Sequence, residues 1–146
     1  MTLDEILKAK GKTVYTIDPE ATLDDVVRTL VQHNVGSLLV RKQGAAEDAQ
    51  PVGIITERDI LHACAAGKAS LADSKVSEVM TGDLITATPG DAVENVMGLM
   101  TGKRIRHLPV VSEGKLVGVV SIGDVVKAQL NRLAMENRFM KDYIQS

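Results

Sequence analysis

The sequence is poor in aromatic residues: Phe, Trp and Tyr together make up only 2% of its 146 residues. Single-stranded nucleic acids usually stack their bases on aromatic side chains, so the chain lacks the platforms for this kind of binding. A formal net charge of -2 also argues against strong binding to a polyanion. We therefore expect no nucleic-acid partner, and a core built from Val, Ile, Leu, Ala and Met.

Long apolar runs and cysteine are also scarce. No run approaches the roughly 20 residues that a membrane-spanning helix needs, and the first residues do not resemble a secretory signal. We predict a cytoplasmic protein that does not bind membranes.

The single cysteine, Cys64, cannot form an intramolecular disulfide and lies in an Ala-rich segment, where a small buried side chain is expected. The three histidines lack paired-ligand spacing, so no metal site is predicted.

The chain does contain an internal duplication. Shifting the sequence by 70 residues aligns residues 14–19 with residues 84–89. The offset then falls to 65, because the first copy carries additional residues at 43–50 where the second has only the turn at 112–115. Small and polar residues fill this insertion, which indicates an exposed loop between two strands.

Both copies show the same order of signals. Apolar residues at helical spacing predict a leading helix, and a short extended stretch that ends at a proline follows it. A capping box then opens a main helix, at Thr22 and Asp25 in the first copy and at Asp91 and Glu94 in the second. Two strands and a second helix complete each copy. The expected segments are leading helices at 3–7 and 76–80, strands at 37–40, 52–55, 108–111 and 116–120, and second helices from 57 to about 66 and from about 122 onward.

Each copy spans about 55 residues, which is too few to bury a comfortable core alone. Two related copies can cover each other's apolar faces. We therefore predict an α+β fold of two βαββα repeats with intramolecular pseudo-two-fold symmetry, plus a long C-terminal helix. The predicted domains are a first repeat with its leading helix at 1–68, a linker at 69–75, a second repeat at 76–131 and a helical extension at 132–146.

The last predicted helix carries an apolar stripe along its length. Its positions alternate by four and three residues, which is the spacing of a coiled coil. The stripe fits pairing with the same helix of a second copy, and it fits equally well an amphipathic tail folded back on its own repeat. The sequence leaves both interpretations open. The stripe consists of Val126, Leu130, Leu133, Met140 and Ile144, with Asn137 in its middle.

Each copy also contains a β-branched strand that leads directly into a helix. A hydroxyl residue stands at the junction and a carboxylate follows three positions later, as Thr56 and Asp59 and as Ser121 and Asp124. This is the spacing of a capping box, so the two side chains can simply satisfy free N–H groups of the helix. A helix N-terminus also attracts phosphate, and a carboxylate accepts hydrogen bonds from a ribose diol. Capping and ligand binding are compatible interpretations.

The duplicated motifs together resemble the cystathionine-β-synthase (CBS) domain. They are Thr-x-x-Pro at 16–19 and 86–89, Leu/Pro-Val at 39–40 and 109–110, and Gly-x-x-Ser/Thr-x-x-Asp at 53–59 and 118–124. The resemblance covers about residues 3–130. It implies two domains packed sheet against sheet, with clefts between them that bind adenosine-containing ligands in many members. It also implies pairing into dimers and, in most members, regulation of an enzyme or transporter.

The resemblance further implies roles for the junction residues. Asp59 and Asp124 are expected to bind ribose hydroxyls, while Thr56 and Ser121 are expected to lie near phosphate. Adenine needs an apolar slot and a few backbone hydrogen bonds. The candidates for that slot are Thr16, Ile17, Thr86 and Ala87.

Basic residues that could balance a phosphate differ between the copies. Arg58 precedes the aspartate of the first copy, whereas a glycine precedes that of the second. Arg106 and His107 stand where the first copy has Gly36 and Ser37. In the family such residues often reach phosphates, although a run of charge is usually a solvated surface. We therefore predict two unequal sites and favour the one in the second copy.

The predicted function is a non-enzymatic regulatory or sensor module. It would bind an adenine nucleotide (AMP, ADP or ATP) or a related adenosyl ligand in the cleft between the repeats, without a required cofactor. We expect a homodimer and a separate, unidentified regulated protein. The alternative is a ligand-independent scaffold for protein interaction or oligomerisation, in which the motif residues only cap helices. The sequence shows neither a nucleophile elbow nor a Walker loop that would favour an enzyme.

Overall fold

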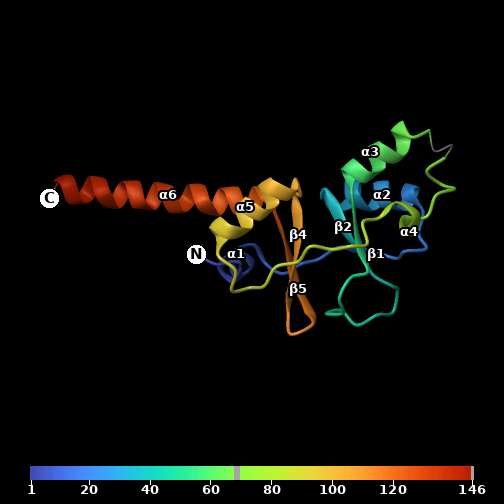
Figure 1. Cartoon of the computed structure of the whole chain (residues 1–146), viewed down its shortest axis with the longest axis horizontal. Helices are drawn as coiled ribbons and strands as arrows, with labels where there is room; N and C mark the ends of the chain where they lie inside the picture. Colours follow the sequence, from blue (N-terminus) through green and yellow to red (C-terminus); the bar gives the residue numbers. More distant parts are fainter. Residues whose placement is uncertain (68–69, 146) are drawn as a thin grey trace. The chain divides into compact units, whose positions relative to one another are not determined.

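The computed structural model of the chain describes residues 1–67 and 70–145. It confirms an α+β fold of two repeats followed by a long C-terminal helix (Figure 1). Lys68 and Ala69, on either side of the predicted boundary between first domain and linker, lie outside the described residues, as does Ser146. The chain forms two compact units. The first-repeat unit contains residues 13–85 and 113–116, and the second-repeat unit contains residues 1–12, 86–112 and the chain from 117 onward.

A three-stranded sheet organises the first-repeat unit. Strands β1 (Thr16–Ile17) and β2 (Ser37–Val40) are parallel because helix α2 (Leu23–His33) connects them, whereas β2 and β3 (Gly53–Thr56) are antiparallel. The apolar sides of α2 and α3 (Glu57–Ala65) pack with this sheet. The buried cluster consists of Leu23, Val26, Leu30, Leu38, Val40, Ile55, Ile60, Ala63 and Val76.

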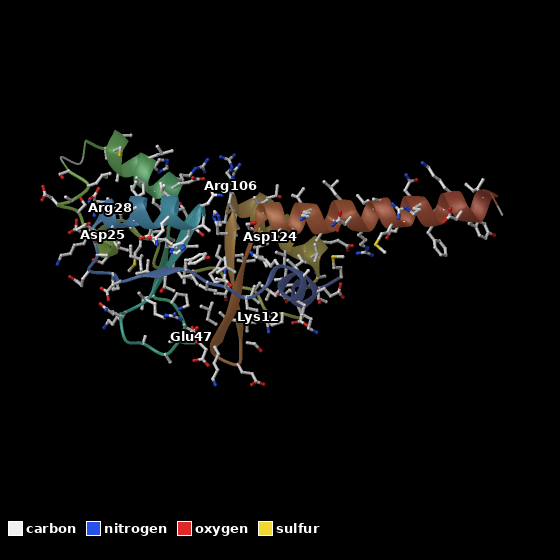
Figure 2. All side chains as sticks on the ribbon, turned by 180° about the vertical axis from the view of Figure 1, so that it is seen from behind. Lys12, Asp25, Arg28, Glu47, Arg106 and Asp124 are labelled. Atoms are coloured by element: carbon white, nitrogen blue, oxygen red, sulfur yellow. The ribbon has the colours of Figure 1, made fainter. Side chains whose placement is uncertain are left out.

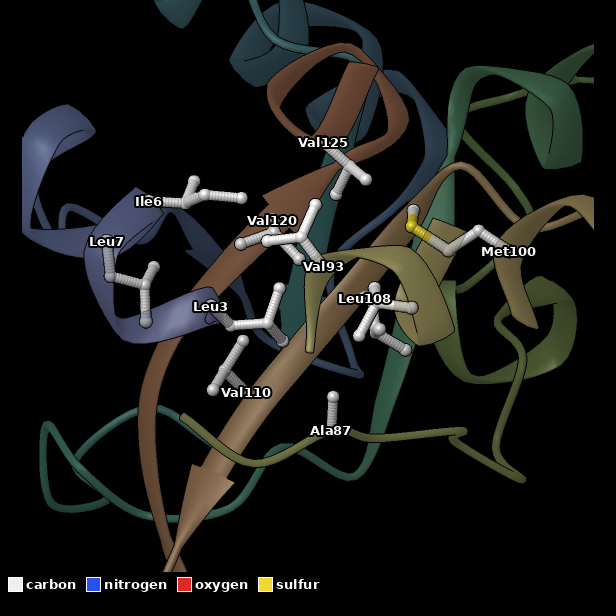
Figure 3. Close-up of a cluster of buried hydrophobic side chains, with 11 residues drawn as sticks. Leu3, Ile6, Leu7, Ala87, Val93, Met100, Leu108, Val110, Val120 and Val125 are labelled. Carbon is white, nitrogen blue, oxygen red and sulfur yellow. The ribbon is translucent and has the colours of Figure 1, made fainter. Parts of the chain in front are cut away.

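A two-stranded sheet of β4 (His107–Ser112) and β5 (Lys115–Ser121) organises the second-repeat unit. The counterpart of β1 is reduced to a single bridge between Ala87 and Val110. Helices α5 (Val93–Lys103) and α6 (Ile122–Gln145) complete the unit. Figure 3 shows its core, which consists of Leu3, Ile6, Leu7, Ala87, Val93, Val96, Met100, Leu108, Val110, Val120 and Val125.

The two leading helices are exchanged between the repeats. Helix α1 (Leu3–Lys10) precedes the first repeat, yet three of its side chains are buried in the core of the second-repeat unit (Figure 3). Helix α4 (Val76–Val79) precedes the second repeat, yet Val76 is buried in the core of the first-repeat unit. Chain order therefore does not tell which repeat's core covers a leading helix. Apolar periodicity shows that a helix has a buried face but not which core covers it.

Backbone hydrogen bonds hold both exchanged segments in the same way. The N–H of Leu3 donates to the carbonyl of Asp91 at 3.1 Å, and the N–H of Val93 donates to the carbonyl of Met1 at 3.0 Å. The equivalent bonds in the first-repeat unit run from Val76 to Ala21 at 2.8 Å and from Leu23 to Ser74 at 3.0 Å. The predicted domain boundaries at 1–68, 69–75, 76–131 and 132–146 stay a prediction.

The caps of the two main helices differ. The capping box of α2 is confirmed, because the Thr22 hydroxyl accepts from the Asp25 N–H and the Asp25 carboxylate accepts from the Thr22 N–H. The capping box predicted for α5 is wrong. The N-cap of α5 is Ala92, which has no hydroxyl, and the Asp91 carboxylate accepts instead from the N–H and hydroxyl of Thr88. The predicted burial of Cys64 is also wrong, because this residue is exposed.

Helix α6 begins in the second-repeat unit and continues past its core. Val125 is buried, and an ion pair of 2.6 Å joins Arg132 to Glu94 on α5. From residue 133 to residue 144 every residue is exposed. Among the described residues, no helix combines the length and the apolar character that crossing a bilayer requires.

Candidate ligand-binding site

The first strand-to-helix junction lies between β3 and α3. The Thr56 N–H donates to Asp59 Oδ2 at 2.9 Å, and the Asp59 N–H donates to Thr56 Oγ1 at 3.3 Å. This reciprocal pair is a complete capping box. Both side chains are half-buried, so the junction is partly open to solvent. The local hydrogen bonds follow directly from the three-residue spacing in the sequence.

The second junction, between β5 and α6, repeats this geometry. The Ser121 N–H donates to Asp124 Oδ2 at 2.9 Å, and the Asp124 N–H donates to Ser121 Oγ at 3.0 Å. In both junctions the carboxylate uses Oδ2 for the cap, and Oδ1 receives no hydrogen bond within residues 1–67 and 70–145. The capping interpretation is therefore correct locally, and each aspartate keeps one oxygen for another donor.

Lys10 distinguishes the second junction from the first. Its ammonium group lies 2.6 Å from Asp124 Oδ2 and donates to the carbonyl of Val119 at 3.0 Å. Lys10 is the last residue of α1, so the exchange of the leading helix brings it to the junction. Within the part of the chain that the structure describes, Asp59 has no ion-pair partner.

This lysine also contributes to a lowered pKa of Asp124. Burial on its own raises the pKa of this carboxyl, but the hydrogen bond from Lys10 and the bond from the Ser121 N–H outweigh it. The net result is a pKa below the ordinary value of 3.8. Asp124 is therefore a carboxylate at neutral pH, which is the form that accepts hydrogen bonds from hydroxyl groups.

Sequence reasoning did not find Lys10. Aligning the leading segments by 73 residues matches Leu3 with Val76 and Leu7 with Met80, and then matches Lys10 with Asp83. This reversal of charge is a signal of unequal sites. It could be read only with the knowledge that the leading helices are exchanged, which two isolated repeat sequences do not contain.

The glycine of each motif permits the exchanged segment to approach. A Cβ on Gly53 would lie 2.6 Å from Met80 Sδ and 2.9 Å from the Thr81 carbonyl oxygen. A Cβ on Gly118 would lie 2.9 Å from Leu7 Cδ2. These two glycines therefore have a packing role at equivalent positions. The motif Gly-x-x-Ser/Thr-x-x-Asp combines this close approach with the cap that follows it.

The structure brings Arg106 to the second junction. The Arg106 carbonyl accepts from the N–H of Ile122, the first residue of α6, at 2.8 Å. Figure 2 shows Arg106 and Asp124 near the same end of β4 and β5. His107 follows as the first residue of β4 and is half-buried. The equivalent bond in the first junction runs from Glu57 to Gly36 at 3.0 Å, where no side chain can add charge.

Arg58 occupies the other position at which the copies differ. It is exposed in the first turn of α3, between the two capping residues of its junction. The second junction has Gly123 there. Each junction therefore has one arginine next to a helix N-terminus, but from a different element.

The adenine candidates have different environments. Thr16 and Ile17 form β1 and are half-buried, and Ile17 packs against the core of the first-repeat unit. Thr86 is exposed. Ala87 is only 4% exposed, and its N–H and carbonyl bond to Pro109 at 3.0 Å and to Val111 at 2.8 Å. A direct contact with a base is therefore easier for Thr86 than for Ala87.

Comparison with known proteins gives the family. The family model described as "CBS domain" matches residues 2–66 and 76–131. The CBS domain-containing protein CBSX3, mitochondrial, of Arabidopsis thaliana is 40% identical over 150 residues, which cover 99% of this chain and 72% of that protein. The chain belongs to the CBS-domain family.

Solved structures agree with this assignment. The CBS-domain containing protein ATU1752 from Agrobacterium tumefaciens has a TM-score of 0.81 at 35% identity, covering 88% of this chain and 99% of that chain. The CBS domain pair of protein MJ0100 has a TM-score of 0.76 at 26% identity, covering 90% and 98%. That structure is a complex with 5-methylthioadenosine and S-adenosyl-L-methionine.

Proposed function

We propose that this chain is a regulatory CBS module that binds an adenosine-containing ligand at its strand-to-helix junctions. The observation that carries the proposal is the pair of junction aspartates, each with one carboxylate oxygen used by the cap and the other without a donor among the described residues. A related CBS pair was crystallised with two adenosyl compounds, which supports the ligand class. An adenine nucleotide such as AMP, ADP or ATP is the specific form that we propose.

Asp124 is the proposed ribose anchor of the preferred site. A carboxylate oxygen that is held in place but lacks a donor suits a ribose hydroxyl, because the cap has already fixed the side chain. Lys10 lowers the pKa of this carboxyl and adds positive charge beside it. Asp59 is the proposed anchor of the second, weaker site.

The start of α6 is the proposed phosphate subsite. A helix N-terminus carries partial positive charge and free N–H groups that bind anions. Arg106 and His107 lie directly before and at the start of β4, and the Arg106 carbonyl already touches this helix start. Ser121 would share its hydroxyl between the cap and the ligand. In the first junction, Thr56 and Arg58 take the corresponding roles.

The proposed adenine neighbours remain Thr16, Ile17, Thr86 and Ala87. Thr86 is the most accessible of these four residues.

The test is a thermal-shift titration of the full chain with AMP, ADP, ATP, S-adenosylmethionine and 5-methylthioadenosine. At a hundredfold excess over the dissociation constant a ligand adds about 2.7 kcal/mol to the free energy of unfolding. Asp124→Asn keeps an oxygen for the Ser121 N–H but turns the other into an N–H donor, so we expect it to remove most of the shift. Asp59→Asn should remove less. Asp142→Asn, on the exposed end of α6, is the matched control.

Each variant is compared with its own ligand-free melting temperature, because the junction substitutions also weaken a cap. Absence of a shift with all five compounds would reject the proposed ligand class. An unchanged shift in a protein that carries both Asp59→Asn and Asp124→Asn would reject the proposed anchors.

A second candidate is a ligand-independent scaffold for protein interaction. It is favoured by the completeness of both capping boxes, which need no ligand to satisfy the helix N–H groups. This candidate predicts that oligomeric state and partner binding do not change when the five compounds are added. Size-exclusion chromatography with and without the compound that gives the largest shift distinguishes the two candidates.

We further propose that the chain is not an enzyme and acts in the cytoplasm. The family match covers both repeats, and the residues at the junctions are already engaged in caps. Incubation with ATP followed by chromatography of the nucleotides tests the first point, because any turnover would appear as ADP or AMP. Cell fractionation tests the second, and it is needed because the Arabidopsis relative is named as mitochondrial.

A further inference from the structure

Helix α6 carries a row of exposed side chains along its whole length. We call this row the α6 seam, and its members alternate by four and three positions. The covered side of the helix is a different one: Val125 is buried and Ala128, Gln129 and Arg132 are half-buried. The seam therefore points away from the second-repeat core. It consists of Val126, Leu130, Leu133, Asn137, Met140 and Ile144, of which Leu130 is 60% and Ile144 76% exposed.

The seam is not explained by the fold of the family. The family match ends at residue 131, so the second half of α6 lies outside it. From residue 133 to residue 144 no residue is buried or half-buried. A helical segment of this length is marginally stable in water without packing. A protein partner on the seam would supply that packing.

We propose that the α6 seam binds the same seam of a second copy of this chain as a parallel, two-stranded coiled coil. In heptad terms, positions a are Leu130, Asn137 and Ile144, and positions d are Val126, Leu133 and Met140. A single Asn at a central a position specifies two strands and one register, because the two amides bond to each other across the interface. An antiparallel pair would place Asn137 against an apolar d residue and leave its amide without a partner.

The charges that flank the seam favour the same arrangement. Glu136 is at position g and Lys141 at position e of the next heptad. In a parallel pair these positions face each other, so each Glu136 lies opposite Lys141 of the second copy. Among the described residues, Glu136 pairs with Arg132 of its own helix at 3.3 Å, and this exposed ion pair is weak enough to exchange. The pairing forms two ion pairs and no contact between like charges at these positions.

Parallel pairing has a consequence for signalling. Helix α6 begins directly after Ser121, so the second junction and the seam belong to one continuous element. The two copies of that junction would lie at the same end of the coiled coil. A ligand that changes the start of α6 would thereby act on both chains, although the coiled coil itself does not depend on the proposed ligand.

The first test is analytical ultracentrifugation of the full chain. We expect a dimer, and we expect the double substitution Leu133→Lys with Met140→Lys to raise the dimer dissociation constant by at least about 100-fold, because it places charge in the seam. The matched control is Met135→Lys with Phe139→Lys, which changes two apolar residues of the same helix that lie outside the seam and are more exposed than Leu133 and Met140. A dimer that survives the seam variant, or that is lost equally in the control, overturns the proposal. Equal loss of the dimer in the control would mean that the dimer contact is not specific to the α6 seam and includes the side of α6 that carries Met135 and Phe139.

The second test concerns direction. Two variants, Glu136→Lys and Lys141→Glu, should each dimerise more weakly, and their mixture should form heterodimers in which both g–e pairs are again opposite in charge. In a Cys64→Ser background, Ile144→Cys should form a disulfide-linked dimer under mild oxidation, because a positions meet in a parallel pair. Failure of the mixture to form heterodimers, or absence of the cross-link, overturns the parallel arrangement.

Discussion

The two strand-to-helix junctions have the same internal hydrogen bonds and different electrostatic surroundings. The two caps are equivalent: one pairs Thr56 with Asp59, and the other pairs Ser121 with Asp124. Lys10, however, forms an ion pair with Asp124, whereas Asp59 has no such partner within residues 1–67 and 70–145. The duplication has therefore preserved the local motif while the exchanged leading segments make the two copies unequal. A site prediction that treats both copies alike misses this difference.

The unequal length of the leading helices causes the difference. Helix α1 has 8 residues and ends at Lys10, and its C-cap is Gly11, whose φ of 91° is easily adopted only by glycine. Helix α4 has 4 residues, and the chain after it becomes extended and pairs with β3 through two bonds between Ile54 and Thr81, of 3.0 and 2.9 Å. Only the longer helix places a lysine beside the junction aspartate.

The largest expected effect comes from the buried side of α1. Leu7 is fully buried, whereas its counterpart Met80 is half-buried. We expect Leu7→Ala to lower the free energy of unfolding by about 2–5 kcal/mol, through lost burial and a cavity, and Met80→Ala to cost less. Urea unfolding monitored by circular dichroism measures both. An equal or larger cost for Met80→Ala would contradict the unequal docking of the two leading helices.

The motif glycines should respond next. Gly53→Ala forces a Cβ against the backbone oxygen of Thr81, which is held by its bond to Ile54, so we expect a cost of about 1–3 kcal/mol. Gly118→Ala meets only the end of the Leu7 side chain, which can rotate, and should cost less. Combining Gly118→Ala with Leu7→Ala should cost less than the sum of the two, because the smaller side chain leaves room. Additive costs would show that the Leu7 contact does not limit this position.

The main-helix caps offer a smaller test. We expect Thr22→Ala to lower the free energy of unfolding by about 1 kcal/mol, because it removes the hydroxyl of a capping box. Ala92→Ser introduces the missing hydroxyl at the N-cap of α5 and should stabilise the chain by a similar or smaller amount. Thermal melting of both variants measures the difference. Destabilisation by Ala92→Ser would mean that the bonds of Asp91 and Val93 to the α1 segment already satisfy this helix start.

The smallest expected effect concerns Lys10. The ion pair is partly exposed, so Lys10→Met should cost only about 0.5–1 kcal/mol at neutral pH. The pKa of Asp124 is lowered by folding, so its contribution is present above the unfolded value of 3.8 and is lost as the pH falls through the folded value. Without Lys10 the pKa of Asp124 in the folded chain is lowered less, so less stability is lost on acidification, and the stability difference between the original chain and Lys10→Met should shrink as the pH falls.

Urea unfolding of the original chain and of Lys10→Met between pH 3 and pH 7 measures how this stability difference changes with pH. Lys8→Met is the matched control, because Lys8 pairs with Asp4 on the exposed side of the same helix. The same pH dependence of the stability difference in the control would show that Lys10 does not act through Asp124.

Most elements and the local part of the site could be predicted from the sequence. The capping boxes at Thr22, Thr56 and Ser121 are correct because they depend on residues three positions apart. The cap predicted for α5 is wrong because the Asp91 carboxylate accepts from Thr88, three positions earlier, instead of from the helix, and the same local spacing permits both. The exposure of Cys64 shows that small size alone does not determine burial.

The sequence by itself determined the duplication, the order of helices and strands, and the hydroxyl and carboxylate at each junction, because these depend on spacing within one copy. Only the tertiary structure decided which core covers each leading helix, and with it the pairing of Lys10 with Asp124 and the packing role of Gly53 and Gly118. Those contacts join segments as far as 114 positions apart. Local propensity depends on residues a few positions apart along the chain, so it carries no information about contacts over that separation.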